Sequence, residues 1–324
     1  MEKKFTFIDL FAGIGGFRIP FDEIGGECVF SSEWDKYSKL TYYDNFGETP
    51  HDDIKKILPS QIPPHDLLLA GFPCQPFSHA GHGKGYDDIR GTAFHNIRNI
   101  ANFHKPKVIL LENVRRFKTH DNGNTYKRIV AVLEGIKYKV TSTILNTKDF
   151  GVPQSRARIY IAAFQNQEDF TSFSFPEPTH EETTVESILD KNPDSKYTIS
   201  DLLWKSHQER KERNKKRGAG FGYGIVNSDS KYTRTLTARY YKDGAEILVE
   251  QKDNNPRKLT INEARKLQGF PKNFEFPVSD VQAYKQLGNA VSVNVIKALA
   301  ESMRHILDSD IKKEYKINKQ IKMT

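Results

Sequence analysis

The sequence predicts an α/β protein built on a doubly wound, mostly parallel sheet of the seven-stranded type, with a second, smaller region that is mixed and rich in loops. Two observations predict the sheet. Short apolar runs alternate with helical patterns as far as residue 164, and a glycine-rich turn directly follows the first run. One observation predicts the second region, because the composition becomes polar after Phe175.

Each apolar run has the length and content of a buried strand. We expect strands at residues 5–11, 27–32, 66–70, 108–111, 140–145 and 159–164. A helical stretch over 37–46 leads to Asp53, which could end a further β-α unit. Thr260 and Glu263 have the spacing of a capping box at a helix start, and a last helix is expected over 295–307.

The composition limits the classes of function. The 324 residues carry a net charge of +8, which suits a polyanionic partner such as nucleic acid. Two cysteines, Cys28 and Cys74, are too few for a disulfide framework or a four-cysteine zinc site, and they favour a reducing compartment. No apolar run approaches the roughly 18 residues of a membrane span, and no signal peptide precedes the first strand, so we expect a cytoplasmic protein.

Residues 71–78, with the sequence Gly-Phe-Pro-Cys-Gln-Pro-Phe-Ser, follow the third strand. Because prolines cannot continue a central strand, the chain must leave the sheet here, and Cys74 falls at a strand's carboxyl end, where open α/β sheets bind ligands. Burial as a small apolar side chain is the alternative for Cys74 when this stretch is taken alone. The next strand ends in Glu112, so a nucleophile and an acid are expected at neighbouring strand ends.

The first turn indicates an adenosine-containing cofactor. Gly13 and Gly15 allow a ligand to approach the backbone at a helix start, but their spacing differs from the dinucleotide fingerprint and disfavours nicotinamide. Glu33 ends the second strand, 20 residues after Gly13, where an acidic side chain typically holds ribose hydroxyls. Trp34 offers an aromatic face for a purine, with packing at the sheet edge as its alternative.

Later stretches combine arginine with polar or glycine-rich sequence. Arg156 and Arg158 point to the same side of a strand start and could clamp one anion or one carboxylate. Residues 205–217 hold seven Lys or Arg against two Glu, a pattern that alone is more typical of a solvated helix face. Glycines, hydroxyls, aromatics and arginines interleave over 218–242, which suits contacts with phosphates and base edges. The glycine-rich loop 79–91 is either a lid or a surface loop.

Six blocks together identify a family. They are Phe-Ile-Asp-Leu-Phe-Ala-Gly-Ile-Gly-Gly (7–16), Gly-Phe-Pro-Cys-Gln-Pro-Phe-Ser (71–78), Glu-Asn-Val (112–114), Gln-x-Arg-x-Arg (154–158), Arg-Lys-Leu-Thr…Leu-Gln-Gly-Phe-Pro (257–271) and Gln-x-Gly-Asn-Ala-Val (286–291). In this order, over essentially the whole chain, they resemble the bacterial DNA (cytosine-5)-methyltransferases of type II restriction-modification systems. Ala290, where many relatives carry serine, and Ala80, where some do, depart from the pattern.

The resemblance implies a role for each matching residue. Cys74 would be the nucleophile, Glu112 its acidic partner, Arg158 a holder of the target base and Arg156 a support of the same pocket. The residues expected around S-adenosylmethionine are Phe11, Gly13, Gly15, Glu33, Trp34, Asp53, Pro73 and Asn289, with Glu33 on the ribose and Trp34 and Phe11 on the adenine. Those expected on double-stranded DNA are Arg234, Arg239, Tyr240 and Lys242, the two arginines as readers of guanine. No metal is implied.

The resemblance also implies domain boundaries and a reaction. Residues 1–178 and 286–324 would form the catalytic domain, 179–260 the target-recognition domain and 261–285 a hinge. A cytosine flipped out of double-stranded DNA would be methylated at C5 through a covalent bond between Cys74 and C6, leaving S-adenosylhomocysteine. The recognition block is similar to those of CCWGG, CCNGG and CCGG enzymes, so we expect a CC(N)GG-type site, with CCWGG first.

The usual setting of such a chain is a bacterial cytoplasmic monomer, bound to DNA, that protects host DNA from a cognate restriction endonuclease, a genetic rather than a physical partner. One alternative is a tRNA cytosine-5 methyltransferase, against which the long basic recognition block argues. The other is a DNA-binding regulator with the same fold, which should have lost Cys74 or Glu112, and both are present. The base that removes the C5 proton is not identified by the sequence.

Overall fold

A computed structural model describes residues 4–73, 93–179, 181–220 and 222–308 of the chain. Its main sheet is formed by β1 (Phe5–Leu10), β2 (Gly26–Ser32), β3 (Leu67–Gly71), β4 (Val108–Val114), β5 (Lys139–Asn146) and β6 (Ala157–Phe164). Their spatial order is β2-β1-β3-β4-β6-β5. Only β6 runs antiparallel to its neighbours, so the predicted doubly wound, mostly parallel sheet is confirmed.

The sheet has six strands among the described residues, which corrects the expectation of seven. The unit expected to end near Asp53 is reduced to a single bridge, in which Ser32 pairs with His51 in parallel. The reason lies in residues 47–53, which are glycine, proline and polar residues with no apolar run to bury against the sheet.

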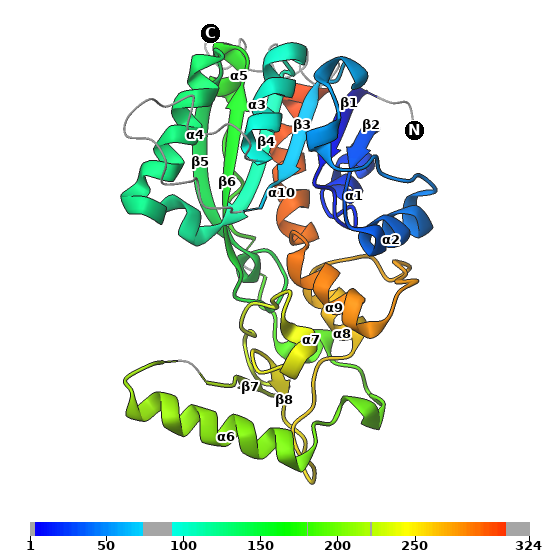
Figure 1. Ribbon diagram of the computed structural model, residues 1–324, viewed down its shortest axis with the longest axis vertical. Coiled ribbons are helices and arrows are strands. Elements are labelled where there is room, and N and C mark those ends of the chain that lie inside the picture. The colour runs from blue at the N-terminus through cyan, green and yellow to red at the C-terminus, as the bar shows by residue number, and fades with distance from the viewer. Residues whose placement is uncertain (1–3, 74–92, 180, 221, 309–324) are drawn as a thin grey trace.

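Helices cover both faces of the sheet (Figure 1). On one side are α1 (Arg18–Glu23), α5 (Gln167–Ser172) and α10 (Val293–Leu307), on the other α3 (Ala93–His104) and α4 (Asn124–Gly135), and α2 (Lys36–Phe46) lies near the β2 edge. Because side chains alternate along a strand, Phe7 packs into the core beneath α1 and α10, whereas Ile8 and Leu10 pack into the core beneath α3 and α4. Because β1 to β5 all run parallel to one another, their carboxyl ends lie at one edge of the sheet, where the antiparallel β6 begins.

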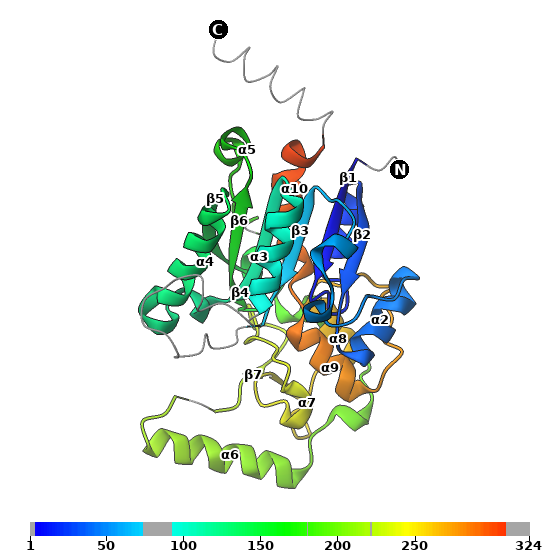
Figure 2. The same cartoon turned by 45° about the horizontal axis from the view of Figure 1, so that its top comes forward.

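A smaller, loop-rich region lies beyond that edge (Figures 1 and 2). It is formed by residues 181–220 and 222–289 and is called the recognition region after its predicted role. It contains α6 (Asp201–Lys216), β7 (Ile225–Val226), α7 (Tyr240–Asp243), β8 (Leu248–Val249), α8 (Ile261–Leu267) and α9 (Asp280–Asn289), with β7 and β8 paired in parallel. A third core of buried apolar side chains fills it, among them Leu236, Tyr240, Leu267, Phe270, Tyr284 and Leu287. Residues 261–285, predicted as a hinge, thus contribute α8 and the first six residues of α9 to a packed core.

The predicted capping box is present at the start of α8. Thr260 Oγ1 accepts the Glu263 backbone N–H at 3.0 Å, and Glu263 Oε2 accepts the Thr260 N–H at 2.8 Å. The same carboxylate binds the buried guanidinium of Arg257 at 2.7 Å. Glu263 therefore both caps the start of α8 and holds the buried Arg257 side chain within the recognition region.

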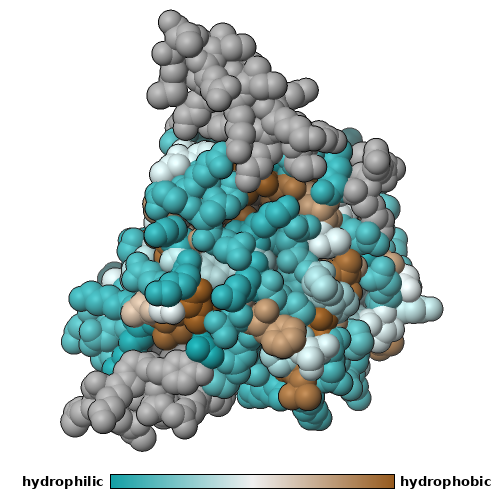
Figure 3. Space-filling model, turned by 90° about the horizontal axis from the view of Figure 1, so that it is seen from above, coloured by the Kyte–Doolittle hydropathy of each residue, from teal (hydrophilic) through white to brown (hydrophobic). Residues whose placement is uncertain are grey.

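The face seen from above, at the end of the molecule away from the recognition region, is mostly hydrophilic with small, separate apolar spots (Figure 3). None of the helices in the described part of the chain has the length and apolar character needed to cross a membrane.

Within the recognition region, α9 packs against the segment before α7 at Gly288. A β-carbon on this glycine would lie 2.2 Å from the backbone carbonyl carbon of Thr237. Backbone therefore packs directly on backbone here, and only glycine leaves the room.

Gly288→Ala is expected to lower the free energy of unfolding by about 1–3 kcal/mol, because the added methyl group must displace the Thr237 backbone. Chemical denaturation measures the change. Gly135→Ala is the matched control, because a β-carbon at this end of α4 meets no atom within 4 Å. It should leave stability unchanged or raise it by up to about 1 kcal/mol. Equal effects of the two substitutions would contradict the close approach.

Candidate active site

The carboxyl ends of β3 and β4 lie side by side, as the sequence predicts. Gly71, the last residue of β3, is the register partner of Glu112 in β4. The side-chain amide of Asn113 donates to the carbonyl oxygen of Phe72 at 3.0 Å and ties the departing chain to β4. Pro73 is exposed directly after this anchor. Cys74 itself lies outside the described residues.

Glu112 and Arg158 form an ion pair at this edge. Arg158 Nε lies 3.1 Å from Glu112 Oε1, and the two side chains are only 15% and 12% exposed. The pair arises because β4 and β6 are antiparallel neighbours. Burial raises the pKa of the Glu112 carboxyl, and the guanidinium groups of Arg158 and Arg156 limit that rise. Glu112 therefore keeps its proton to a higher pH than an exposed glutamate and sits beside a fixed cation.

Arg156 has different partners from Arg158. Its guanidinium donates to three backbone carbonyls, those of Leu236 at 2.9 Å, Gly288 at 3.2 Å and Ala290 at 2.7 Å. Burial and the neighbouring Arg158 lower the pKa of Arg156 to about 9. The expectation that both arginines clamp one group is therefore corrected. Strand alternation sets their starting direction, but the long side chains reach separate partners, and Arg156 acts by joining three segments.

Glu33 joins the turn after β1 to the loop after β2. Its Oε2 accepts the Gly13 N–H at 2.9 Å and its Oε1 accepts the Asp35 N–H at 2.8 Å. Burial raises the pKa of Glu33, and these backbone donors oppose the rise. The turn itself requires left-handed backbone, with φ of +57° at Phe11 and Gly13 and +82° at Gly15.

The surroundings of Glu33 fit an adenosine-containing group. Trp34 follows directly and is 74% exposed, which leaves its ring free to stack on a purine. The Asp53 segment is adjacent, because the Glu33 N–H donates to His51 O at 2.9 Å, two residues earlier. Asn289 is exposed at the end of α9, and Val291 packs against Gly16 in the first turn. Within the described ranges, no group of three or more His, Cys, Asp or Glu could hold a metal ion.

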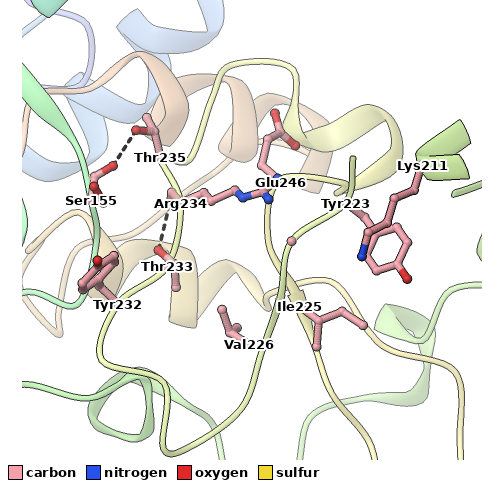
Figure 4. Close-up of a pocket in the computed structure, with 11 residues that line it drawn as sticks. Ser155, Lys211, Tyr223, Ile225, Val226, Tyr232, Thr233, Arg234, Thr235 and Glu246 are labelled. Atoms are coloured by element: carbon pink, nitrogen blue, oxygen red, sulfur yellow. Dashed lines mark hydrogen bonds between the residues drawn. The ribbon is translucent and has the colours of Figure 1, made fainter. Parts of the chain in front are cut away.

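Of the two arginines expected to read DNA, Arg234 lines an open cavity in the recognition region. Arg234 is exposed and donates to Gly222 O at 2.8 Å, and Arg239 and Lys242 are also exposed. The cavity has a volume of about 750 Å³ (Figure 4), and its lining includes Ser155, Lys211, Tyr223, Tyr232, Arg234 and Glu246. The cavity therefore reaches from the start of β6 to α6.

The expectation that Tyr240 contacts DNA is corrected by its position. Its side chain is fully buried. The hydroxyl donates to Ile247 O and accepts the Leu259 N–H, both at 2.7 Å. The aromatic residue thus belongs to the core of the recognition region, because its ring packs edge-on against Tyr284.

Comparison with known families assigns the chain. The family described as "C-5 cytosine-specific DNA methylase" matches residues 5–305. The chain belongs to this family. This methylase is 52% identical over 319 residues to the type II methyltransferase M.DsaV of Dactylococcopsis salina, covering 98% of this chain and 91% of that one. It is 53% identical over 312 residues to M1.ScrFI of Lactococcus lactis subsp. cremoris, covering 95% and 80%.

A solved structure supports the fold. The Entamoeba histolytica methyltransferase EhMeth superposes with a TM-score of 0.76 at 26% sequence identity, covering 94% of this chain and 99% of that one. The methylase is therefore a DNA (cytosine-5)-methyltransferase with the α/β methyltransferase fold.

The sequence reasoning missed a buried charged cluster below the first turn of the methylase. Arg18 donates to both carboxylate oxygens of Glu48, at 2.8 and 3.1 Å, and to Asp22 Oδ2 at 3.0 Å, and it lies over the Phe46 ring. Asp9 is fully buried nearby, and its carboxylate oxygens have no hydrogen-bond partner among the described residues. The sequence did contain a signal for this cluster, because Asp9 is an acidic residue within the apolar run of the first strand.

Asp9 makes the stability of the methylase depend on pH. Burial raises its pKa to about 8, opposed by Arg18. The folded state therefore binds one proton more than the unfolded chain from about pH 4 to about pH 8. Stability should fall as pH rises through this window, by up to about 1.4 kcal/mol per pH unit from this group.

Asp9→Asn is expected to remove that part of the pH dependence, because the amide stays neutral. Urea unfolding between pH 5 and pH 8 measures it. Asp44→Asn, at an exposed position in α2, should keep the native dependence. If Asp9→Asn left the dependence unchanged, Asp9 would be ionised in the folded protein.

Proposed function

We propose that the methylase transfers a methyl group from S-adenosylmethionine to C5 of a cytosine flipped out of double-stranded DNA, through a covalent bond between Cys74 and C6. The observation that carries the proposal is the Glu112–Arg158 pair, which sits where β3 ends and the chain continues toward Cys74. A buried acid and a fixed cation at this place suit a nitrogen base that gains charge during the reaction.

The chemistry requires activation of the cytosine ring, because C5 is a poor nucleophile. Addition of the Cys74 thiolate to C6 breaks the C5–C6 double bond and raises electron density at C5. Glu112, whose pKa burial raises, would donate or share a proton with N3 and stabilise the charge that develops there. Arg158 holds the Glu112 carboxyl and faces the base. After methylation, loss of the C5 proton to a base restores the double bond and expels the Cys74 thiolate.

The cofactor would be held along the first turn. Glu33 would bind the ribose hydroxyls with the lone pairs that its two backbone donors leave unused, and Trp34 and Phe11 would contact the adenine. Gly13, Gly15, Asp53, Pro73 and Asn289 would complete the pocket. When bound, S-adenosylmethionine supplies an electrophilic methyl group, and S-adenosylhomocysteine is the product.

The proposed target is a CC(N)GG-type site, with CCWGG first. Its support is the exposure of Arg234 and Arg239, since arginine bonded to guanine O6 and N7 is the commonest specific contact in the major groove. Lys242 would contact the phosphate backbone of the DNA. The methylase would act as a monomer in the bacterial cytoplasm and protect host DNA from a cognate restriction endonuclease, a genetic rather than a physical partner.

The first experiment is covalent trapping. Duplexes carry 5-fluorocytosine at defined positions in CCWGG, CCNGG, CCGG and unrelated sites, because fluorine at C5 cannot leave as a proton. With S-adenosylmethionine present, mass spectrometry should find an adduct at Cys74 on the inner cytosine of one site class. No adduct on any duplex, with cofactor binding intact, would reject the mechanism, and equal trapping on unrelated sites would reject the proposed specificity.

Glu112→Gln is expected to lower kcat by about 10²–10⁴-fold, the usual contribution of a general acid. Because this step needs a proton on Glu112, native activity should decline as pH rises through the raised pKa of Glu112. The residual activity of Glu112→Gln should lack this alkaline decline. Steady-state methylation across pH measures both effects. Glu301→Gln, at an exposed position in α10, serves as the control and should behave as the native enzyme. An alkaline decline that survives in Glu112→Gln would assign it to another group.

A further inference from the structure

Helix α6 lies at the end of the recognition region farthest from the main sheet (Figures 1 and 2). Ser200 caps its start by accepting the Leu203 N–H. Two contacts fix its middle, since His207 is buried against the Asp243 carbonyl and Arg210 pairs with the Asp243 carboxylate at 3.0 Å. The helix is therefore held on the recognition region rather than projecting freely.

Most cations on and directly after α6 have no ion pair with an acidic side chain in the described part of the chain. Residues 205–217 hold seven Lys or Arg and two Glu. Two of the seven make ion pairs, Arg210 with Asp243 and Arg213 with Glu209. The five without an ion pair to any described residue are Lys205, Lys211, Lys215, Lys216 and Arg217. The surplus is a local positive charge that a polyanion would neutralise.

Two of these lysines lie on the side of α6 that faces the cavity. Lys211 lines the cavity together with Arg234 and Ser155 (Figure 4). Lys215 follows one turn later, about 40° around the helix, whereas Lys205 and Lys216 lie about 120–140° away from Lys211. All four side chains are exposed. The helix therefore offers one cationic pair toward the cavity and one matched pair away from it.

Gly222 connects Lys211 to Arg234, the arginine expected to read bases. The Lys211 ammonium lies 4.4 Å from the centre of the Tyr223 ring. A β-carbon on Gly222 would lie 2.9 Å from Lys211 Cγ, so the lysine stem packs on that glycine, whose carbonyl accepts Arg234 at 2.8 Å. A duplex with a base edge at Arg234 would thus bring its backbone phosphates toward Lys211.

The helix dipole does not account for Lys211. Cations near a helix carboxyl end are stabilised by the helix dipole, but that effect fades within the last turn. Lys211 lies five residues before the last helical residue, Lys216, and is outside it.

We propose that Lys211 and Lys215 bind backbone phosphates of double-stranded DNA beside the bases that Arg234 reads. The proposal rests on the proposed function, whose DNA substrate it extends by a contact surface on α6. These contacts position the duplex without reading its sequence. They add affinity that depends on salt, because each neutralised phosphate releases counterions.

The test compares Lys211→Gln/Lys215→Gln with the control Lys205→Gln/Lys216→Gln, which removes the same charge from the other side of α6. Binding to a duplex with a CCWGG site and to an unrelated duplex is measured over a salt series. For the first variant, the slope of log affinity against log salt should become shallower by about 2, and binding should weaken roughly tenfold on both duplexes. The control should keep the native slope, and Lys211→Arg/Lys215→Arg should restore it.

Equal slope changes in the two double variants would overturn the proposal, because net charge alone would then explain them. Lys215→Gln alone guards against misfolding, because the Lys215 side chain is exposed and makes no ion pair or ring contact with the described residues. It should make the slope shallower by about 1, and an unchanged slope would also overturn the proposal. Methylation by the native protein is followed in parallel. Failure to methylate with the slope difference present rejects the proposed function alone, and methylation with unchanged slopes rejects only the role of α6.

Discussion

The buried guanidinium of Arg156 is the contact on which the arrangement of the methylase depends. Arg156 lies directly before β6. Its guanidinium donates to the carbonyl of Leu236, which precedes α7, and to those of Gly288 and Ala290 in the last sequence block. Burying a cation is costly, and three carbonyl dipoles offset that cost only in one arrangement of the segments. Gln154 acts beside it, accepting the Leu236 N–H and donating to Leu267 O. Catalytic and recognition surfaces therefore share one fixed junction.

Two buried carboxyl groups on either side of this junction are held in different ways. Glu112 is held by a guanidinium at the end of β4, and Glu33 by backbone amides at the end of β2. Burial raises the pKa of both. In the proposed mechanism, the side-chain cation would leave Glu112 able to exchange a proton with a bound base, whereas the amides would fix Glu33 as an acceptor. The same residue type would thus serve proton transfer at one strand end and ligand binding at another.

In the recognition region, buried side chains pack the core, and exposed side chains are available for binding. Its core takes Tyr240 and Tyr284, while Arg234 stays exposed and is oriented by a backbone carbonyl. The Gly222 carbonyl already fixes the position of the Arg234 guanidinium. Little conformational entropy would therefore be lost when Arg234 binds a partner. The unpaired lysines of α6 extend the same positive surface away from the junction.

The strands, the glycine turn, the capping box at Thr260 and the neighbouring ends of β3 and β4 could all be predicted without a structure. They follow from local sequence pattern and from the parallel order of neighbouring strands. The sequence predicted neither the burial of Tyr240 nor the separate partners of Arg156, and it missed Asp9. Those depend on which segments meet across long sequence separations, such as Leu236 on residue 156. The burial of Tyr240 and Asp9 and the partners of Arg156 are therefore seen only in the folded chain. A long or aromatic side chain takes its role from the carbonyls, rings and charges that the fold brings within reach.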